Sequence, residues 1–160
     1  MPKSVLLLFC YNCYNVVMIL SIDYGEKYVG LAVADGKLKI ALPYKVLENK
    51  SDKFLLNNLK EIISQEKVEK IIVGEPISLS GRRTGQTKVV ARFIKKLKQE
   101  ISPVKFIKTR MAFKRVNIPV VGFDERLTSK MAEKLPIKGK EGHAVAAAII
   151  LQNYLSWLDN

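Results

Sequence analysis

The chain has 160 residues, of which 48% are hydrophobic, a combination that predicts one folded domain and excludes an intrinsically disordered chain. Its formal charge of +12 favours a polyanionic partner, either nucleic acid or an anionic membrane, with a lysine-rich solvated surface as the simpler alternative. The two cysteines, Cys10 and Cys13, are too few for a disulfide scaffold or a four-thiolate zinc site, and no surrounding βαβ pattern supports a redox role.

An apolar segment precedes the predicted domain. Val5–Ile22 carries no charge, but a membrane-spanning helix needs about 20 predominantly apolar residues, and its last part, Met18–Ile22, fits a core strand better. A secretory signal is disfavoured because no small-residue cleavage site follows. We therefore expect Met18 to be the true start of the protein and residues 1–17 to be a dispensable or mis-assigned extension. Residues 18–160 are then a cytoplasmic domain that does not bind a membrane.

Three short strands are predicted at the start of this domain. Met18–Ile22 is an apolar run, and Tyr28–Val33 follows a glycine-containing turn. Asp35-Gly36 is a strong signal for a two-residue hairpin turn. Lys37–Leu42 alternates in polarity and is predicted to be the third strand of an antiparallel meander.

Helices and buried strands alternate in the remainder of the chain. Apolar residues at helical spacing predict a helix over Ser51–Glu66, and the apolar run Lys70–Val73 that follows is expected to pair in parallel with an earlier strand. The later predicted elements are a helix (Thr87–Ile101), a strand (Pro119–Phe123), a short helix (Leu127–Leu135) and a final apolar helix (Ala144–Leu158). The order β-β-β-α-β-α-β-α predicts an α/β domain with one five-stranded mixed sheet and helices on both faces.

Acidic residues follow two of the predicted strands. Asp23 ends the first strand, and the glycine after it allows a ligand to approach the backbone closely. Asp124 and Glu125, followed by Arg126, end the strand Pro119–Phe123. Parallel strands would bring both groups to one sheet edge, where α/β sheets bind ligands and carboxylates suit a hard divalent cation. Ordinary turns with local ion pairs are the alternative at both places.

The only histidine, His143, stands at the predicted start of the last helix. An imidazole placed where a helix N-terminus meets the sheet edge can ligate a metal or activate water. The alternative is a surface histidine without a chemical role.

The connection between residues 74 and 86 has the composition of a phosphate-binding loop. It leads from a strand into a helix and contains Ser80, Gly81, Arg82 and Arg83. Glycine backbone, hydroxyls, arginines and a helix N-terminus all bind phosphate, although the GK[ST] of a Walker A motif is absent. A polar connecting loop is the alternative.

The stretch 101–123 contains no acidic residue, and its lysines and arginines alternate with Phe106 and Phe113. Basic charge with interleaved aromatic rings suits a nucleic-acid backbone with exposed bases. A solvated basic face with two packed phenylalanines is the alternative.

Four segments in this order resemble the YqgF/RuvX family of ribonuclease H-like nucleases. They are Asp23-Tyr-Gly with Lys27 and Val29-Gly30-Leu-Ala, then Ile72-Val-Gly-x-Pro-Ile with Gly81 and Gln86, then Pro119-Val-Val-Gly-Phe-Asp124-Glu-Arg-Leu-Thr-Ser, and finally Ala144-Val-Ala-Ala-Ala-Ile-Ile-Leu-Gln. The resemblance covers nearly all of residues 18–160 and implies a ribonuclease H-like fold.

The resemblance also implies hydrolysis of phosphodiester bonds with Mg²⁺ or Mn²⁺. Asp23 would be the central metal ligand, and Asp124 or Glu125 the second. His143 stands where the family usually has an aspartate, and its imidazole is a candidate third ligand. Glu75 replaces a usually apolar residue and could supply a compensating carboxylate.

The resemblance also implies residues that contact the substrate. Lys27, Arg82, Arg83 and Arg126 are expected to bind phosphates. The family is linked to maturation of the 5′ end of 16S rRNA, which implies pre-rRNA, with ribosomal particles, as partners of a monomer or homodimer. Resolution of four-way DNA junctions and a non-catalytic nucleic-acid-binding module are the alternatives. A sugar-kinase-like ATPase is disfavoured, because 160 residues cannot supply its two lobes.

Overall fold

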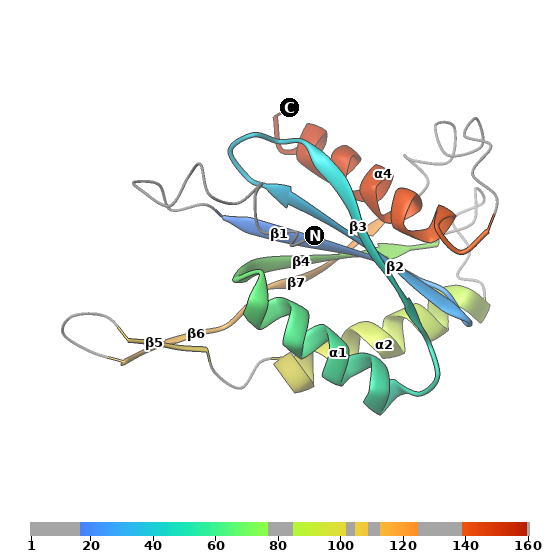
Figure 1. Ribbon diagram of the computed structural model, residues 1–160, viewed down its shortest axis with the longest axis horizontal. Helices are drawn as coiled ribbons and strands as arrows, with labels where there is room; N and C mark the ends of the chain where they lie inside the picture. The colour runs from blue at the N-terminus through green and yellow to red at the C-terminus, as the bar shows by residue number, and fades with distance from the viewer. Residues whose placement is uncertain (1–16, 77–84, 102–104, 109–112, 125–138, 160) are drawn as a thin grey trace, which may run out of the picture.

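The computed structural model describes residues 17–76, 85–101, 105–108, 113–124 and 139–159. Its main elements are β1 (Met18–Tyr24), β2 (Tyr28–Asp35), β3 (Ala41–Glu48), α1 (Asp52–Gln65), β4 (Val68–Glu75), α2 (Gly85–Ile101), β7 (Val120–Asp124) and α4 (Gly142–Trp157). Five of these form one sheet in the order β3-β2-β1-β4-β7. Figure 1 shows α1 and α2 on one face of this sheet and α4 on the other.

The central strand β1 joins the antiparallel and parallel halves of the sheet. It pairs antiparallel with β2, which pairs antiparallel with β3. On its other side β1 pairs in parallel with β4, which pairs in parallel with β7. The carboxyl ends of β1, β4 and β7 therefore meet at one edge. The predicted five-stranded mixed sheet with helices on both faces is confirmed.

Alternation along β1 divides the core into two layers. Leu20 and Ile22 are fully buried and pack with α1 and α2, whereas Ile19 packs with α4. The helix α1 begins after Ser51, whose side chain accepts a hydrogen bond from the Phe54 amide at 3.3 Å, and it buries one face. The final helix α4 packs on β1 and β2 through small residues such as Ala147, and its predicted burial against the sheet is confirmed.

The third strand differs from its prediction. β3 occupies Ala41–Glu48 rather than Lys37–Leu42, and the predicted two-residue turn at Asp35-Gly36 is a longer connection. Lys39 has a positive φ of 54° there, and its amide donates to the Asp35 carbonyl at 2.9 Å. The sequence pattern misled because β3 is an edge strand with most side chains exposed, so its burial does not alternate.

A second sheet was not predicted. β5 (Lys105–Lys108) and β6 (Phe113–Val116) pair antiparallel within the basic stretch between α2 and β7. The hairpin projects from the main sheet in Figure 1. The predicted order therefore lacked two strands, because dense lysine and arginine in these short segments obscured any apolar periodicity.

One predicted helix and most of the proposed N-terminal extension are not part of the described structure. The predicted short helix Leu127–Leu135 lies outside the described residues, as do residues 1–16 of the proposed extension. Within the described ranges, every helix is too short or too polar to cross a membrane.

Candidate active site

Asp23 lies near the end of the central strand, on the sheet face that α4 covers. Ile19 of the same strand packs with α4, so residues at even spacing from it, Ser21 and Asp23, point the same way. The Asp23 side chain is 21% exposed, so it is largely buried but open to solvent at the sheet edge.

His143 meets Asp23 from the other end of the chain. It is the second residue of α4, and its Nδ1 lies 3.0 Å from Asp23 Oδ2. The approach depends on Gly30 of β2, because a Cβ there would overlap the His143 carbonyl group. Gly25 also leaves room, since a Cβ at that position would lie 3.3 Å from His143 Cε1.

The electrostatics of this pair are dominated by burial. Burial raises the pKa of the Asp23 carboxyl above its usual range, and the hydrogen bond and charge of His143 lower it in part. When the Asp23 carboxyl is ionised it can only accept, so His143 Nδ1 then donates their hydrogen bond. An imidazole that donates from Nδ1 and carries no charge keeps a lone pair on Nε2.

Asn49, which follows β3, forms hydrogen bonds with the turn after β1. Gly25 donates its amide to the Tyr28 carbonyl at 3.1 Å, and Asn49 Nδ2 donates to the Gly25 carbonyl at 3.0 Å. The Asn49 amide also donates to the Lys27 carbonyl at 2.9 Å. Lys27 Nζ lies 5.5 Å from the centre of the Tyr28 ring, and that ring lies 6.0 Å from the His143 ring, centre to centre. Neither Tyr28 nor Asn49 was predicted as a site residue, because neither carries a recognisable motif of its own.

Asp124 and Glu75 end their strands at the same sheet edge, opposite one another in register. Phe123 packs with α4, so the adjacent Asp124 points to the α2 side. Glu75 also faces α2, where it lines a shallow pocket with Lys98, and Gly122 leaves the space that its carboxylate fills. The structure therefore does not bring these two carboxylates beside Asp23.

Comparison with known proteins identifies the family. A model of the RuvX family, described as "Holliday junction resolvase", matches residues 17–157. This chain belongs to the RuvX family.

Sequence relatives in this family share a name. A protein of Rickettsia bellii (strain OSU 85-389), named "Putative pre-16S rRNA nuclease", is 34% identical over 146 residues, covering 86% of this chain and 85% of its own. A Dictyoglomus turgidum protein with the same name is 34% identical over 148 residues, covering 88% of this chain and 94% of its own.

Solved structures confirm the fold of this RuvX chain. Thermus thermophilus RuvC, solved in complex with a Holliday junction substrate, superimposes with a TM-score of 0.53 at 14% identity, over 90% of this chain and 96% of that protein. The similarity supports the ribonuclease H-like fold expected from the sequence.

Several predicted site residues of this RuvX chain lie outside the described residues. They are Glu125, Arg126, Ser80, Gly81, Arg82 and Arg83. Their expected roles in metal and phosphate binding therefore remain predictions. Asp23 and His143 are the described candidates that the fold brings into contact, whereas Lys27 contacts the ring of Tyr28, which lies next to the His143 ring.

The described residues include two of the donors that the sequence predicted for a divalent metal. No group of three or more His, Cys, Asp or Glu side chains suited to a metal occurs among them. Asp23 and His143 nevertheless offer a carboxylate oxygen and an imidazole nitrogen at one position, a donor pair that fits Mn²⁺ or Mg²⁺ with water completing the shell. A largely buried carboxylate, raised in pKa by burial, also favours a nearby cation.

Proposed function

We infer that this protein is a nuclease that hydrolyses phosphodiester bonds with a divalent metal, Mg²⁺ or Mn²⁺. The observation that carries the proposal is the contact between Asp23 and His143 at the carboxyl end of the central strand. Membership of the RuvX family supports this assignment. The charge of +12 supports a polyanionic substrate.

The described residues have separate roles in this proposal. Asp23 would hold the metal, with Glu125 as the predicted second ligand and His143 as the candidate third. A bound divalent ion lowers the pKa of water and neutralises charge on the phosphate. The 3.0 Å contact between Asp23 Oδ2 and His143 Nδ1 orients the imidazole toward the carboxylate. Lys27, next to the Tyr28 ring, would bind a phosphate of the substrate.

The proposed substrate is the 5′ end of pre-16S rRNA, met in the cytoplasm and within ribosomal particles. The shared name of relatives covering 85% or more of their own length supports this choice. A four-way DNA junction is the second candidate, supported by the description of the family. A junction has two scissile strands, so that candidate would require two copies of this chain.

The test compares the full chain with an Asp23→Asn variant. Each protein is incubated with a precursor 16S rRNA 5′-end fragment and with a four-way DNA junction, in Mg²⁺ and separately in Mn²⁺. Asp159→Asn is the matched control, because Asp159 follows the C-terminal end of α4, whereas His143 lies at its N-terminal end. The Asp159 side chain is exposed and forms a surface ion pair with Lys39.

The expected result is cleavage of the rRNA fragment by the full chain and the control, with loss of at least 10²-fold in Asp23→Asn. Preferential junction cleavage would move the assignment to the second candidate. Binding of nucleic acid without cleavage in either metal would contradict the nuclease and favour a non-catalytic binding module.

A further inference from the structure

We propose that a groove between β3 and the start of α4 binds one unpaired nucleobase of the substrate next to the cleaved phosphate, with Tyr28 as its stacking surface. The proposal rests on the proposed nuclease function and adds a specificity site to it. The groove has a volume of about 510 Å³, within the range of sites that hold small molecules. A single base with its sugar fits such a space.

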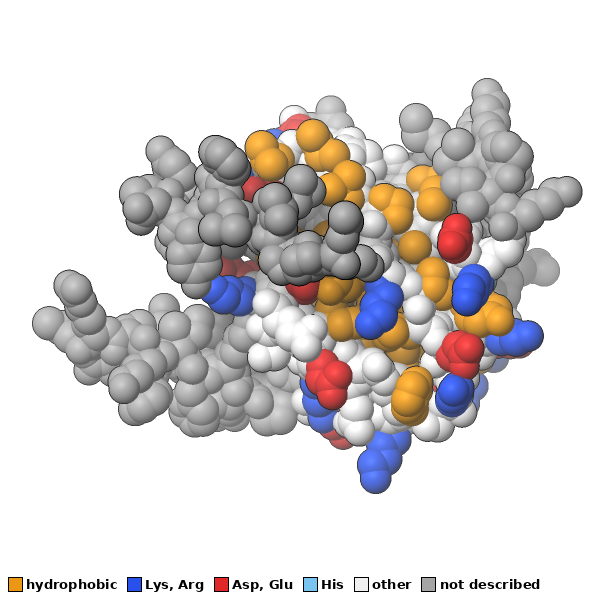
Figure 2. All heavy atoms as spheres, in the orientation of Figure 1, with side chains coloured by type: hydrophobic (Ala, Val, Ile, Leu, Met, Phe, Trp, Pro, Cys, Tyr) orange, Lys and Arg blue, Asp and Glu red, His pale blue; other side chains and the backbone are white. Residues whose placement is uncertain are grey.

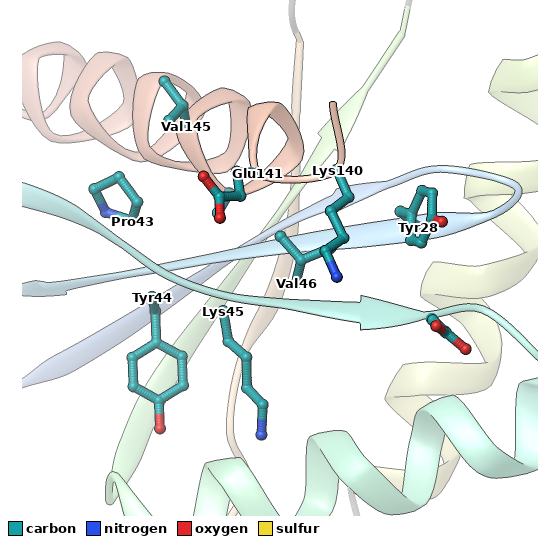
Figure 3. A pocket seen from close by; sticks show the side chains of 10 residues that line it. Tyr28, Pro43, Tyr44, Lys45, Val46, Lys140, Glu141 and Val145 are labelled. Carbon is teal, nitrogen blue, oxygen red and sulfur yellow. The ribbon is translucent and has the colours of Figure 1, made fainter. Parts of the chain in front are cut away.

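Both apolar and charged side chains line the groove. Pro43 and Val46 of β3 lie on one side, and Lys140, Glu141 and Val145 at the start of α4 lie on the other (Figure 3). In Figure 3 Lys140 reaches from the turn before α4 toward β3, and Tyr28 lies at one end of the groove. This arrangement suits a planar base with polar edges.

Tyr28 connects the groove to the catalytic pair. Its ring lines the groove, and its centre lies 6.0 Å from the centre of the His143 ring. Lys27 Nζ also lies near this ring, 5.5 Å from its centre. A strand whose phosphate lies at Asp23 and His143 would therefore present its neighbouring base to Tyr28.

The charges around the groove favour a phosphodiester backbone. Glu48 at its rim pairs with Lys50 at 3.2 Å, which neutralises one acidic residue. Within the described part of the chain, neither Lys45 nor Lys140 forms an ion pair. These two lysines outnumber the remaining acid, Glu141. Figure 2 shows apolar, basic and acidic side chains interspersed on the face that carries β3 and α4.

An unpaired nucleotide fits the groove better than a duplex. The bases of a duplex are stacked and paired, so they cannot enter a side groove without being extruded. Single-stranded bases can be splayed out and stacked on an aromatic ring regardless of their identity. The groove would therefore direct cleavage to single-stranded positions of a precursor.

The experiment scans a single-stranded precursor oligoribonucleotide with one abasic position at a time. Dissociation constants are measured without divalent metal, so that no cleavage occurs, for the full chain and for Tyr28→Ala, Tyr28→Phe and Val46→Glu. Phe54→Ala is the matched control, because Phe54 is an exposed aromatic residue on α1 outside the groove.

For the unmodified chain and Tyr28→Phe, one or two abasic positions are expected to raise Kd about tenfold, the effect of losing one stacked base. Tyr28→Ala and Val46→Glu should bind the intact oligonucleotide about tenfold more weakly and lose the dependence on position. Phe54→Ala should behave like the unmodified chain.

A Kd that does not depend on abasic position, or a dependence that survives in Tyr28→Ala, would overturn the groove assignment. Failure of the nuclease proposal looks different, because position-dependent binding would then persist while no metal supports cleavage. Cleavage without position-dependent binding would retain the nuclease and reject the groove.

Discussion

Gly30 of β2 lies directly against the backbone of His143 at the start of α4. A Cβ on Gly30 would overlap the carbonyl group of His143 and crowd the amide of Ala144. The absence of a side chain at this one strand position allows the helix to approach the sheet. That approach places His143 Nδ1 within 3.0 Å of Asp23 Oδ2.

Replacing Gly30 with alanine should therefore displace α4. We expect Gly30→Ala to lower the free energy of unfolding by about 1–3 kcal/mol, the usual cost of overpacking, and to reduce cleavage more than tenfold. Thermal unfolding and initial cleavage rates measure the two effects. Gly85→Ala is the control, because a Cβ there meets nothing within 4 Å; equal losses in both variants would contradict the role of Gly30.

Asp23→Asn should stabilise the fold while it removes activity. Burial raises the pKa of Asp23, so the folded state favours the protonated carboxyl and holds the ionised form at a cost. Stability from this group is present at low pH and is lost as pH rises through the raised pKa. At pH 7.5 we expect Asp23→Asn to raise Tm by about 2–4 °C, equivalent to roughly 1 kcal/mol.

The gain of Asp23→Asn should shrink as pH falls through the raised pKa of Asp23, because the native carboxyl then becomes protonated. Calorimetry at several pH values measures this change, with Asp159→Asn as the exposed control. A lower Tm for Asp23→Asn at pH 7.5 would show that the interaction with His143 outweighs burial.

His143→Ala should move the acidic limb of the cleavage profile to higher pH. The hydrogen bond and charge of His143 lower the pKa of Asp23, so their removal raises it further and keeps the carboxyl protonated over a wider range. The maximal rate should fall as well, because His143 is a proposed ligand of the metal. Initial rates measured against pH in Mn²⁺ test both effects.

His143→Gln is the comparison variant for this profile. Its amide can still donate to Asp23 but has no basic nitrogen, so the rate should fall while the acidic limb shifts less than in His143→Ala. An acidic limb that stays in place in His143→Ala would contradict coupling between the two side chains.

Ser21 offers a stability test beneath the same site. It is fully buried on β1, and its hydroxyl has no hydrogen-bond partner among the described residues. Ser21→Ala removes an unsatisfied polar group and should raise the free energy of unfolding by about 1 kcal/mol. Ser51→Ala should lower it by about 1 kcal/mol, because Ser51 caps α1. Denaturant unfolding distinguishes the two, and destabilisation by Ser21→Ala would show that its hydroxyl is bonded.

Binding of single-stranded RNA should weaken steeply with salt. Each neutralised phosphate contributes about −0.7 to the slope of log K against log salt concentration. Lys27→Ala should reduce the magnitude of this slope by about that amount. Fluorescence anisotropy over about 50–200 mM salt measures it. Lys96→Ala is the control, since Lys96 pairs with Asp52 between α1 and α2; equal slopes in all proteins would exclude a phosphate contact at Lys27.

Several strands and helices could be predicted because each one shows its own pattern of apolar residues along the sequence. The apolar run at Met18–Ile22, the helical spacing after Ser51 and the apolar final helix each reflect burial of neighbouring residues. β3 was misplaced because an edge strand is mostly exposed and lacks alternation. β5 and β6 were missed because their pairing joins two segments that are individually short and basic.

The acidic residues at the end of β7 show that a sequence motif does not predict which face of the sheet a side chain points to. Asp124 was expected beside Asp23, and its strand does end at the same sheet edge. Neighbouring residues of a strand nevertheless point to opposite faces, and Phe123 occupies the α4 side. Which acidic residue faces Asp23 therefore depends on the register of β7, which no motif encodes.

The amino-acid sequence by itself determined the α/β class, the strand that ends at Asp23 and the helix that begins near His143, because hydrophobic periodicity reports local burial. Only the tertiary structure decided that these two side chains, 120 residues apart, form one hydrogen bond. It also decided that Tyr28 joins their site to a groove. Such contacts depend on how closely a helix can pack on a sheet, and here the missing side chain of Gly30 sets that distance.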